Sequence, residues 1–173
     1  MIIRKANSAD AKSLSILGRK TFQATFAKDN TKEDMEAYLD VTYNEPRQRA
    51  EISDPNRRIE IAWIGKEAVG FLHLLIGTPE PCVTGPNPIE LLRIYVDTSW
   101  HGKDVGKALM NRAIEIAASE GYQTIWLGVS NKNFRAQAFY RKFGFKEVGV
   151  HIFQLGSKRQ WDLVMSRHQE RIL

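Results

Sequence analysis

The sequence predicts an α/β fold around a mixed central sheet. Short runs of apolar and β-branched residues alternate with longer segments whose apolar residues recur every three or four positions, which indicates interspersed strands and helices. The second half contains two strand-helix-strand units, and the first half contains a hairpin. The expected order is a strand, a group of helices, three strands, a helix, a strand, a helix and two final strands.

The chain opens with an expected strand over residues 2–6, after which Ser8 or Asp10 can cap a helix. The apolar face of this helix is formed by Leu14, Leu17, Phe22 and Phe26. Thr31 and Asp34 have the spacing of a capping box, which predicts a second helix.

Pro46 is expected to start a third, short helical turn. Strands over 58–64 and 68–76 then form a hairpin around residues 65–67. The segment 77–88 is rich in proline and is expected to be a loop.

The second half repeats strand and helix signals up to its end. The expected strands cover 89–96, 124–129, 145–148 and 161–165, and the expected helices cover 105–120 and 133–143. Gly121 and Gly144 follow the two helices, as is typical of helix ends.

Length and composition are those of one globular domain, residues 1–173. No apolar run approaches the ~20 residues that a membrane-spanning helix requires, so we expect no membrane association. The single Cys82 cannot form an internal disulfide, and a cytoplasmic location is the default expectation. The net charge of +5 comes from scattered Lys and Arg without interleaved aromatics, so a nucleic-acid partner is not indicated. The four histidines show no metal-ligand spacing, so we expect no metal.

The turn between the strand at 89–96 and the following helix is built to hold phosphate. Gly102 and Gly106 let the backbone approach a ligand, the helix begins with free N–H groups, and Lys103 and Lys107 add positive charge. The alternative is that the glycines serve only packing and turn geometry. The turn matches neither a Walker loop nor a dinucleotide fingerprint, which removes ATPase and dehydrogenase functions.

A second segment, residues 133–145, carries polar groups on a helix. Asn133 can cap this helix, and Ala136 and Tyr140 lie on one face, four residues apart. The alternative for Tyr140 is a core tyrosine whose hydroxyl is satisfied locally.

In this order and spacing, the two segments resemble the GCN5-related N-acetyltransferase (GNAT) family, which binds acetyl-coenzyme A. The family's pyrophosphate motif, Gln/Arg-x-x-Gly-x-Gly/Ala, falls on residues 101–106. Its later Asn-x-x-Ala-x-x-x-Tyr motif falls on Asn133, Ala136 and Tyr140 and is followed by Gly-Phe. The resemblance implies a GNAT-like sheet of about seven strands, flanked by helices and splayed in the middle for acetyl-CoA.

A closer similarity is to the PaiA-type polyamine N-acetyltransferases. The segments that carry it are residues 21–26, Met35, Tyr38, Leu39, 93–96, 125–129, Gly149, His151, Phe153, Gln160 and Asp162.

Two positions depart from the family motif. His101 stands where Gln or Arg is usual, and it can still donate a hydrogen bond to phosphate. Asp104 stands where Gly is usual; an aspartate tolerates left-handed backbone geometry and can cap the next helix, but its charge repels pyrophosphate by about 1 kcal/mol or less.

The resemblance implies direct transfer of the acetyl group, with acetyl-CoA between the two central strands and Tyr140 as the proton donor to the leaving thiolate. The implied cofactor contacts are Ile94, Tyr95, Val96, His101, Gly102, Lys103, Asp104, Val105, Gly106, Lys107, Asn133, Ala136, Tyr140 and Lys142.

The acceptor amine must lose a proton, and Glu90, at the start of the strand that lines the cleft, is the expected base; the alternative is a solvent-facing strand end. Residues expected to contact the acceptor are Phe22, Phe26, Glu33 and Glu36. For the acidic residues the alternative is a solvated helix face.

The expected function is acetylation of a primary amine, a polyamine such as spermidine or spermine. The alternatives are a protein N-terminus, a lysine or an antibiotic amine as acceptor, and a non-catalytic CoA-binding regulator. The chain is expected to be a monomer or a homodimer.

Overall fold

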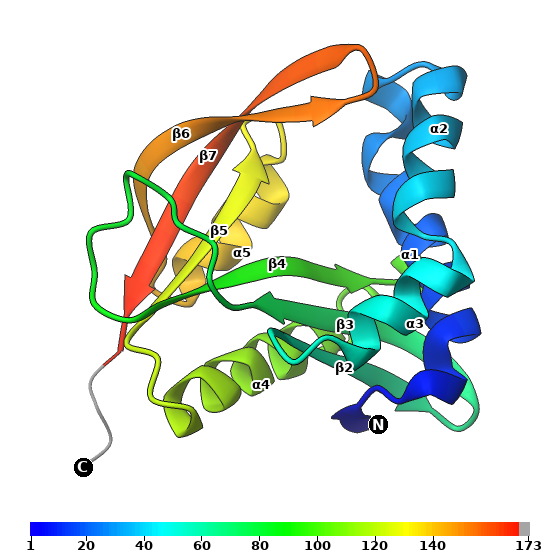
Figure 1. Cartoon of the computed structure of the whole chain (residues 1–173), viewed down its shortest axis with the longest axis horizontal. Helices are drawn as coiled ribbons and strands as arrows, with labels where there is room; N and C mark the ends of the chain where they lie inside the picture. Colours follow the sequence, from blue (N-terminus) through cyan, green and yellow to red (C-terminus); the bar gives the residue numbers. More distant parts are fainter. Residues whose placement is uncertain (170–173) are drawn as a thin grey trace.

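A computed structural model of the chain describes residues 1–169 and contains a seven-stranded sheet with helices on both faces (Figure 1). The strands are β1 (Ile2–Lys5), β2 (Arg57–Ile64), β3 (Glu67–Leu75), β4 (Pro88–Val96), β5 (Thr124–Ser130), β6 (Lys146–Leu155) and β7 (Lys158–His168). The helices are α1 (Ala11–Phe26), α2 (Lys32–Thr42), α3 (Glu45–Ser53), α4 (Val105–Ser119) and α5 (Phe134–Lys142). The predicted α/β class and order of elements are confirmed, and the last four residues of the expected domain lie outside the described part.

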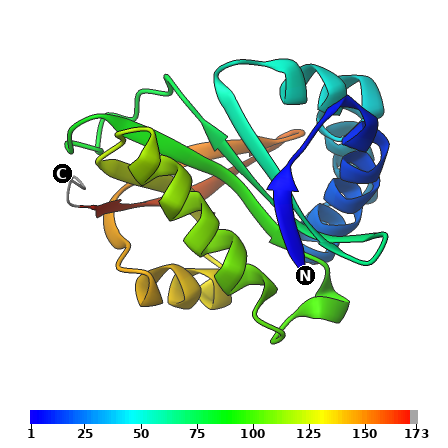
Figure 2. The same ribbon diagram turned by 90° about the horizontal axis from the view of Figure 1, so that it is seen from below.

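The sheet order is β1-β2-β3-β4-β5-β7-β6, with β4 and β5 as its parallel pair. Helix α4 crosses one face, and α1, α2 and α3 lie on the other (Figure 2). The core is therefore double: α4 and α5 pack on β3, β4 and β5 on one face, and the first three helices pack on β2 and β3 on the other. No helix within residues 1–169 is long and apolar enough to cross a membrane.

Strands β4 and β5 part soon after they meet. Their parallel register runs only from Pro88↔Thr124 to Glu90↔Trp126. Beyond this point β4 stays paired with β3 up to Val96, and β5 stays paired with β7 up to Ser130, so the two central strands diverge (Figure 1). The divergence leaves one backbone edge of each strand without a strand partner, which is the opening that the resemblance implies.

A β-bulge in β4 controls which side chains face the first three helices. His73 pairs with Arg93 and Leu74 pairs with Leu91, so Leu92 has no register partner in β3. An extra residue of this kind shifts the alternation of side chains along the bulged strand. As a result Arg93 lies on the same face as Glu90, although three positions separate them.

Two features of the first helices differ from the expectation. Asn7, rather than Ser8 or Asp10, caps the opening turn: its side chain accepts a hydrogen bond from Ala9 N (2.9 Å), and Asp10 Oδ2 accepts one from Asn7 N (2.9 Å). Asp10 precedes α1 without a side-chain cap of its own.

Helix α3 is also longer than the expected single turn. Asn44 caps it by accepting a hydrogen bond from Arg47 N (2.8 Å). Ion pairs one turn apart, Arg49 with Glu45 (2.6 Å) and Arg47 with Glu51 (2.9 Å), support its full length.

The last two strands form a much longer hairpin than expected. β6 and β7 pair from Lys146↔Ser166 to Leu155↔Lys158 around a turn whose Gly156 has φ +58°. Asp34 of α2 accepts a hydrogen bond from Ser157 N (3.2 Å), and Gln160 donates one to Asn30 (2.9 Å). The tip of the hairpin is therefore bound to the start of α2, which closes the α1–α2 side of the molecule.

Gly18 is the point at which α1 makes its closest approach to Tyr43. A Cβ at Gly18 would lie 2.2 Å from Tyr43 Cδ1, and the Tyr43 side chain is fully buried. Although alanine is the better helix former by about 1 kcal/mol, we predict that Gly18→Ala lowers the free energy of unfolding by about 2 kcal/mol, because the tyrosine ring has no space to move into. Urea denaturation measures this change.

The matched control is the same substitution in a Tyr43→Leu background, where Gly18→Ala should cost little or nothing. A single Gly18→Ala variant as stable as the parent would contradict the packing described.

Candidate active site

Three segments meet at the open end of the gap between β4 and β5: the end of β4, the turn before α4 and the start of α5. His101 Nε2 lies 2.9 Å from Val96 O, and Arg135 Nη1 lies 3.0 Å from His101 Nδ1. A Cβ on Gly106 would lie 3.7 Å from both Val96 Cγ2 and Phe139 Cζ. The structure therefore brings the two sequence motifs together.

His101 is fully engaged in this arrangement. Nε2 donates to the Val96 carbonyl, so Nδ1 is left to accept the hydrogen bond from Arg135. A hydrogen bond from His101 to phosphate, as expected, would require the bond to Val96 to open. Arg135, which sequence reasoning did not select, then adds a third cation beside Lys103 and Lys107.

The turn has the backbone that an anion site needs. Gly102 has φ +75° and Asp104 has φ +60°, so the expected left-handed geometry at Asp104 is confirmed. Its expected capping role is wrong, because a side-chain cap requires an extended backbone and Asp104 makes no such bond. The first helical hydrogen bond runs from Ala108 N to Asp104 O (2.9 Å), so the preceding N–H groups of α4 have no intrahelical acceptor.

Charged side chains of the turn point outward. Lys103 and Lys107 are exposed, and Lys103 Nζ lies 4.6 Å from the Trp100 ring centre. Val105 is buried and anchors the turn to the core.

Helix α5 places the expected proton donor. Asn133 Oδ1 accepts a hydrogen bond from Ala136 N (3.1 Å), which confirms the predicted cap. Tyr140 is half-buried beside Phe139 and Phe145, and burial raises its pKa, so the phenol is protonated at neutral pH. Lys142, at the end of the helix, is exposed.

Along β4, Ile94 and Val96 pack toward α4, whereas Tyr95 packs toward α1. Glu90 lies at the last register pair before the strands part and is only 9% exposed. It is therefore not a solvent-facing strand end. Burial raises its pKa, while the nearby hydroxyl of Thr78 acts in the opposite direction.

A cluster that sequence reasoning did not select lies on the same face as Glu90. His151 Nδ1 lies 3.0 Å from Glu80 Oε2, and His151 Nε2 lies 4.0 Å from Asp162 Oδ2. The Trp126 ring meets the His151 ring edge-on, with centres 6.4 Å apart. His151 and Asp162 are register partners on β6 and β7, and a correct prediction of that hairpin's alternation would have placed them together.

The expected acceptor residues are placed in two environments. Phe22 is buried and stacks on Tyr38 (4.6 Å), and half-buried Phe26 lies next to Phe22 (4.4 Å). Glu33 and Glu36 are exposed on α2, and Glu36 lies 3.8 Å from Lys32. The aromatic residues thus line the interior beside β4, and the two glutamates face solvent.

A buried ion-pair cluster fixes α3 to this face of the sheet. Glu51 accepts hydrogen bonds from Arg93 (2.7 Å) and Arg47 (2.9 Å). His73 lies between Arg57 (3.1 Å) and Arg93 (3.3 Å), and burial together with these cations lowers its pKa well below its usual value, which keeps the ring neutral.

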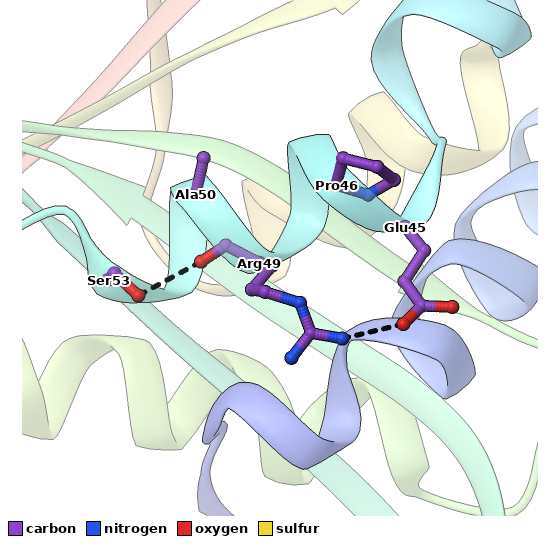
Figure 3. Close-up of a pocket in the computed structure, with 5 residues that line it drawn as sticks. All are labelled: Glu45, Pro46, Arg49, Ala50 and Ser53. Atoms are coloured by element: carbon purple, nitrogen blue, oxygen red, sulfur yellow. Dashed lines mark hydrogen bonds and ion pairs between the residues drawn. The ribbon is translucent and has the colours of Figure 1, made fainter.

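A shallow hollow on the outer side of α3 is lined by Glu45, Pro46, Arg49, Ala50 and Ser53 (Figure 3). Its polar groups bond to one another: Arg49 pairs with Glu45, and Ser53 Oγ donates to Arg49 O (3.0 Å). None of the expected site residues lines it. In the part of the chain that the structure describes, no three His, Cys, Asp or Glu side chains gather as metal ligands.

Asp162 carries a cost in stability. Burial raises its pKa from 3.8 to about 6. A carboxyl of this kind has a higher pKa in the folded state than in the unfolded state. It stabilises the protein at pH values below the unfolded-state pKa, and this stabilisation is lost as the pH rises through the folded-state pKa. We therefore predict that Asp162→Asn raises the free energy of unfolding above pH 6, by about 2 kcal/mol after allowance for partial exposure, and changes little near pH 4.

Chemical denaturation from pH 4 to 8 measures this difference; exposed Glu33→Gln is the control and should not be stabilised above pH 6, because its carboxylate lies in the first turn of α2. An Asp162→Asn variant that is less stable than the parent at pH 8 would contradict the assignment.

Comparison with known proteins gives matches over most of the chain. Residues 22–145 match the Acetyltransferase (GNAT) family. An uncharacterized N-acetyltransferase from the pepI 3' region of Lactobacillus delbrueckii subsp. lactis is 32% identical over 165 residues, which cover 95% of each chain.

Two matches come from Thermoplasma acidophilum. A spermidine N(1)-acetyltransferase is 28% identical over 148 residues, covering 83% of this chain and 87% of the relative. The crystal structure of PaiA N-acetyltransferase in complex with coenzyme A has a TM-score of 0.79 and 26% identity, covering 97% of this chain and 98% of that one. By the match to the family and by the extent of these similarities, the chain belongs to the GNAT family and is an N-acetyltransferase, with acetyl-CoA as the implied acetyl donor.

Proposed function

We propose that this N-acetyltransferase moves the acetyl group of acetyl-CoA directly to a primary amine of a polyamine such as spermidine or spermine. The observation that carries the proposal is the position of the gap between β4 and β5. A turn with a left-handed backbone and free helical N–H groups lies at its open end, and a set of carboxylates lies on the face of the first three helices.

The cofactor fits the groups around the gap. The free edge of β4 at Ile94, Tyr95 and Val96 can pair with the amide groups of pantetheine as a further strand would. The N–H groups at the start of α4 can bind the pyrophosphate, and Lys103, Lys107 and Arg135 can neutralise its charge.

The acceptor side carries negative charge in a protein that is basic overall. Glu80, Glu90 and Asp162 lie together around His151, and such a site attracts an ammonium group. The similarity to a spermidine acetyltransferase supports a polyamine as the acceptor. A protein N-terminus, a lysine or an antibiotic amine would use the same chemistry.

Tyr140 is the proposed proton donor to the departing thiolate. The raised pKa keeps the phenol protonated at neutral pH, so a proton is available for the sulfur as the C–S bond breaks. A CoA-binding regulator would have no use for this hydroxyl.

The proposal predicts that the purified protein releases free thiol from acetyl-CoA when offered spermidine or spermine. Tyr140→Phe should lower kcat by about 100-fold with little change in the KM for acetyl-CoA, because the hydroxyl acts in the transition state and not in binding. Thiol release followed with a colorimetric reagent measures both parameters.

Tyr122→Phe is the matched control and should leave the rate unchanged, because Tyr122 lies after α4 on the outer part of the core. No thiol release with any amine of a broad panel would favour the regulator, and a fully active Tyr140→Phe variant would remove Tyr140 from the reaction.

The left-handed backbone and the charge of Asp104 both bear on cofactor binding. We predict that Asp104→Asn and Asp104→Gly each lower the KM for acetyl-CoA by about fivefold, because either change removes a carboxylate beside the pyrophosphate. Asp104→Gly should also raise the free energy of unfolding by about 1 kcal/mol, since glycine adopts this φ without strain.

Asparagine tolerates the same left-handed backbone, so the stability of the Asp104→Asn variant should stay near that of the parent. The comparison of the two variants therefore separates the effect of charge from the effect of backbone strain. An unchanged KM in both variants would mean that the Asp104 carboxylate points away from the bound cofactor.

A further inference from the structure

His151 lies directly over β5 at the point where the gap opens. A Cβ on Gly128 would lie 2.7 Å from His151 Nε2, so only a glycine at this position of β5 leaves room for the ring. Gly128 comes two residues after Trp126, the last residue of β5 that pairs with β4. The Nε2 atom therefore faces the place where the proposed reaction joins its two substrates.

The groups around His151 are acidic or neutral. Glu80 faces it from the loop before β4, Asp162 from β7 and Glu90 from β4, and Cys82 of the same loop contacts Glu80. Burial raises the pKa of Cys82, which keeps the thiol neutral, and its Sγ donates to Glu80 Oε1 (3.2 Å). A positive charge on the ring would thus be met by three carboxylates.

We propose that His151, oriented by Glu80, is the base that takes the proton from the acceptor amine, an inference that rests on the proposed acetyl transfer. Glu80 Oε2 accepts the hydrogen bond of Nδ1–H at 3.0 Å, which leaves the lone pair of Nε2 free. After Nε2 accepts a proton, the imidazolium lies between Glu80 and Asp162, and both carboxylates stabilise it.

The proton balance requires one base for the amine and one acid for the departing thiolate. The ammonium of the acceptor loses a first proton to Nε2, which passes it to water, since the His151 side chain is 30% exposed. The neutral amine then forms the C–N bond to the acetyl carbon, and the nitrogen loses its second proton to Nε2 as the C–S bond breaks. Tyr140 supplies the proton of the thiol and regains one from water, so the reaction releases one proton.

Two observations favour His151 over Glu90 in this step. Glu90 is more enclosed and lies where β4 and β5 still pair, whereas His151 is accessible beyond the point of divergence. The His151 Nε2 atom also lies over Gly128, two residues beyond the last pair of β4 with β5.

A further group beside His151 lacks a partner. The Trp126 side chain is only 4% exposed, and its Nε1–H has no hydrogen-bond partner among residues 1–169. The Trp126 ring meets the imidazole ring edge-on, and its unpaired donor is available to an acceptor atom of a bound ligand.

The test compares His151→Asn with the parent protein in the thiol-release assay, with spermidine from pH 6 to 9. We expect kcat to fall by about 100-fold with an unchanged KM for acetyl-CoA, and to recover partly on addition of imidazole. Glu80→Gln keeps a hydrogen-bond acceptor for Nδ1–H and should lower kcat by about tenfold, because it removes one of the stabilising charges.

His168→Asn is the matched control, since His168 contacts Thr124 at the far end of β7, and it should leave the profile unchanged. If the parent protein acetylates spermidine and the His151→Asn and Glu80→Gln variants keep its full rate and pH profile, only the role of His151 is overturned. Glu90 then becomes the proposed base. A parent protein that acetylates no amine would overturn the proposed function as well.

Discussion

The arrangement of the site depends on the parting of β4 from β5. On one edge, β4 stays hydrogen-bonded to β3, and β5 stays hydrogen-bonded to β7. On the other edge, the two strands pair with each other only up to Glu90 and Trp126. Backbone N–H and C=O groups that face such a gap need partners, and Val96 O finds one in His101. The gap therefore combines unpaired main-chain groups with a rigid frame, which suits a ligand that binds as an extended segment.

The frame is held by a costly but well-paired cluster under α3. Arg93, the residue after the bulge in β4, bonds to Glu51 of α3 and lies over the Tyr43 ring at 5.1 Å. The neutral His73 ring separates Arg93 from Arg57 without adding a charge of its own. Removing Glu51 would leave the buried Arg93 guanidinium without a carboxylate partner, whereas Arg57 would keep Asp54, so the cluster ties the path of β4 to α3.

Local features could be predicted from the sequence because their physical causes are local. The glycines and Asp104 of the turn, the Asn133 cap and the helical face with Ala136 and Tyr140 all follow from spacing within a few residues. The cap of the first turn is Asn7 and not Ser8 or Asp10, since all three are good capping residues and only the register of the turn selects among them.

The acidic cluster could not be predicted, because its members come from distant segments of the chain. Glu80 lies in a proline-rich loop without a periodic signal, and His151 and Asp162 lie on strands that extend well beyond the ranges expected. Val150 and Ile152 face outward and are exposed, so β6 lacks the apolar-in, polar-out alternation that marks a strand. Once the hairpin register is known, the pairing of His151 with Asp162 follows directly.

The alternation of side chains along β5 separates the two proton transfers of the proposed reaction. Leu127 packs toward the face on which α5 presents Tyr140, whereas Trp126 and Gly128 face His151. A proton taken from the amine and a proton given to the thiolate therefore travel on opposite faces of one strand. The buried phenol stays neutral in its apolar surroundings, and the imidazole can become charged between carboxylates. One base and one acid with such different environments can act in the same turnover without neutralising each other.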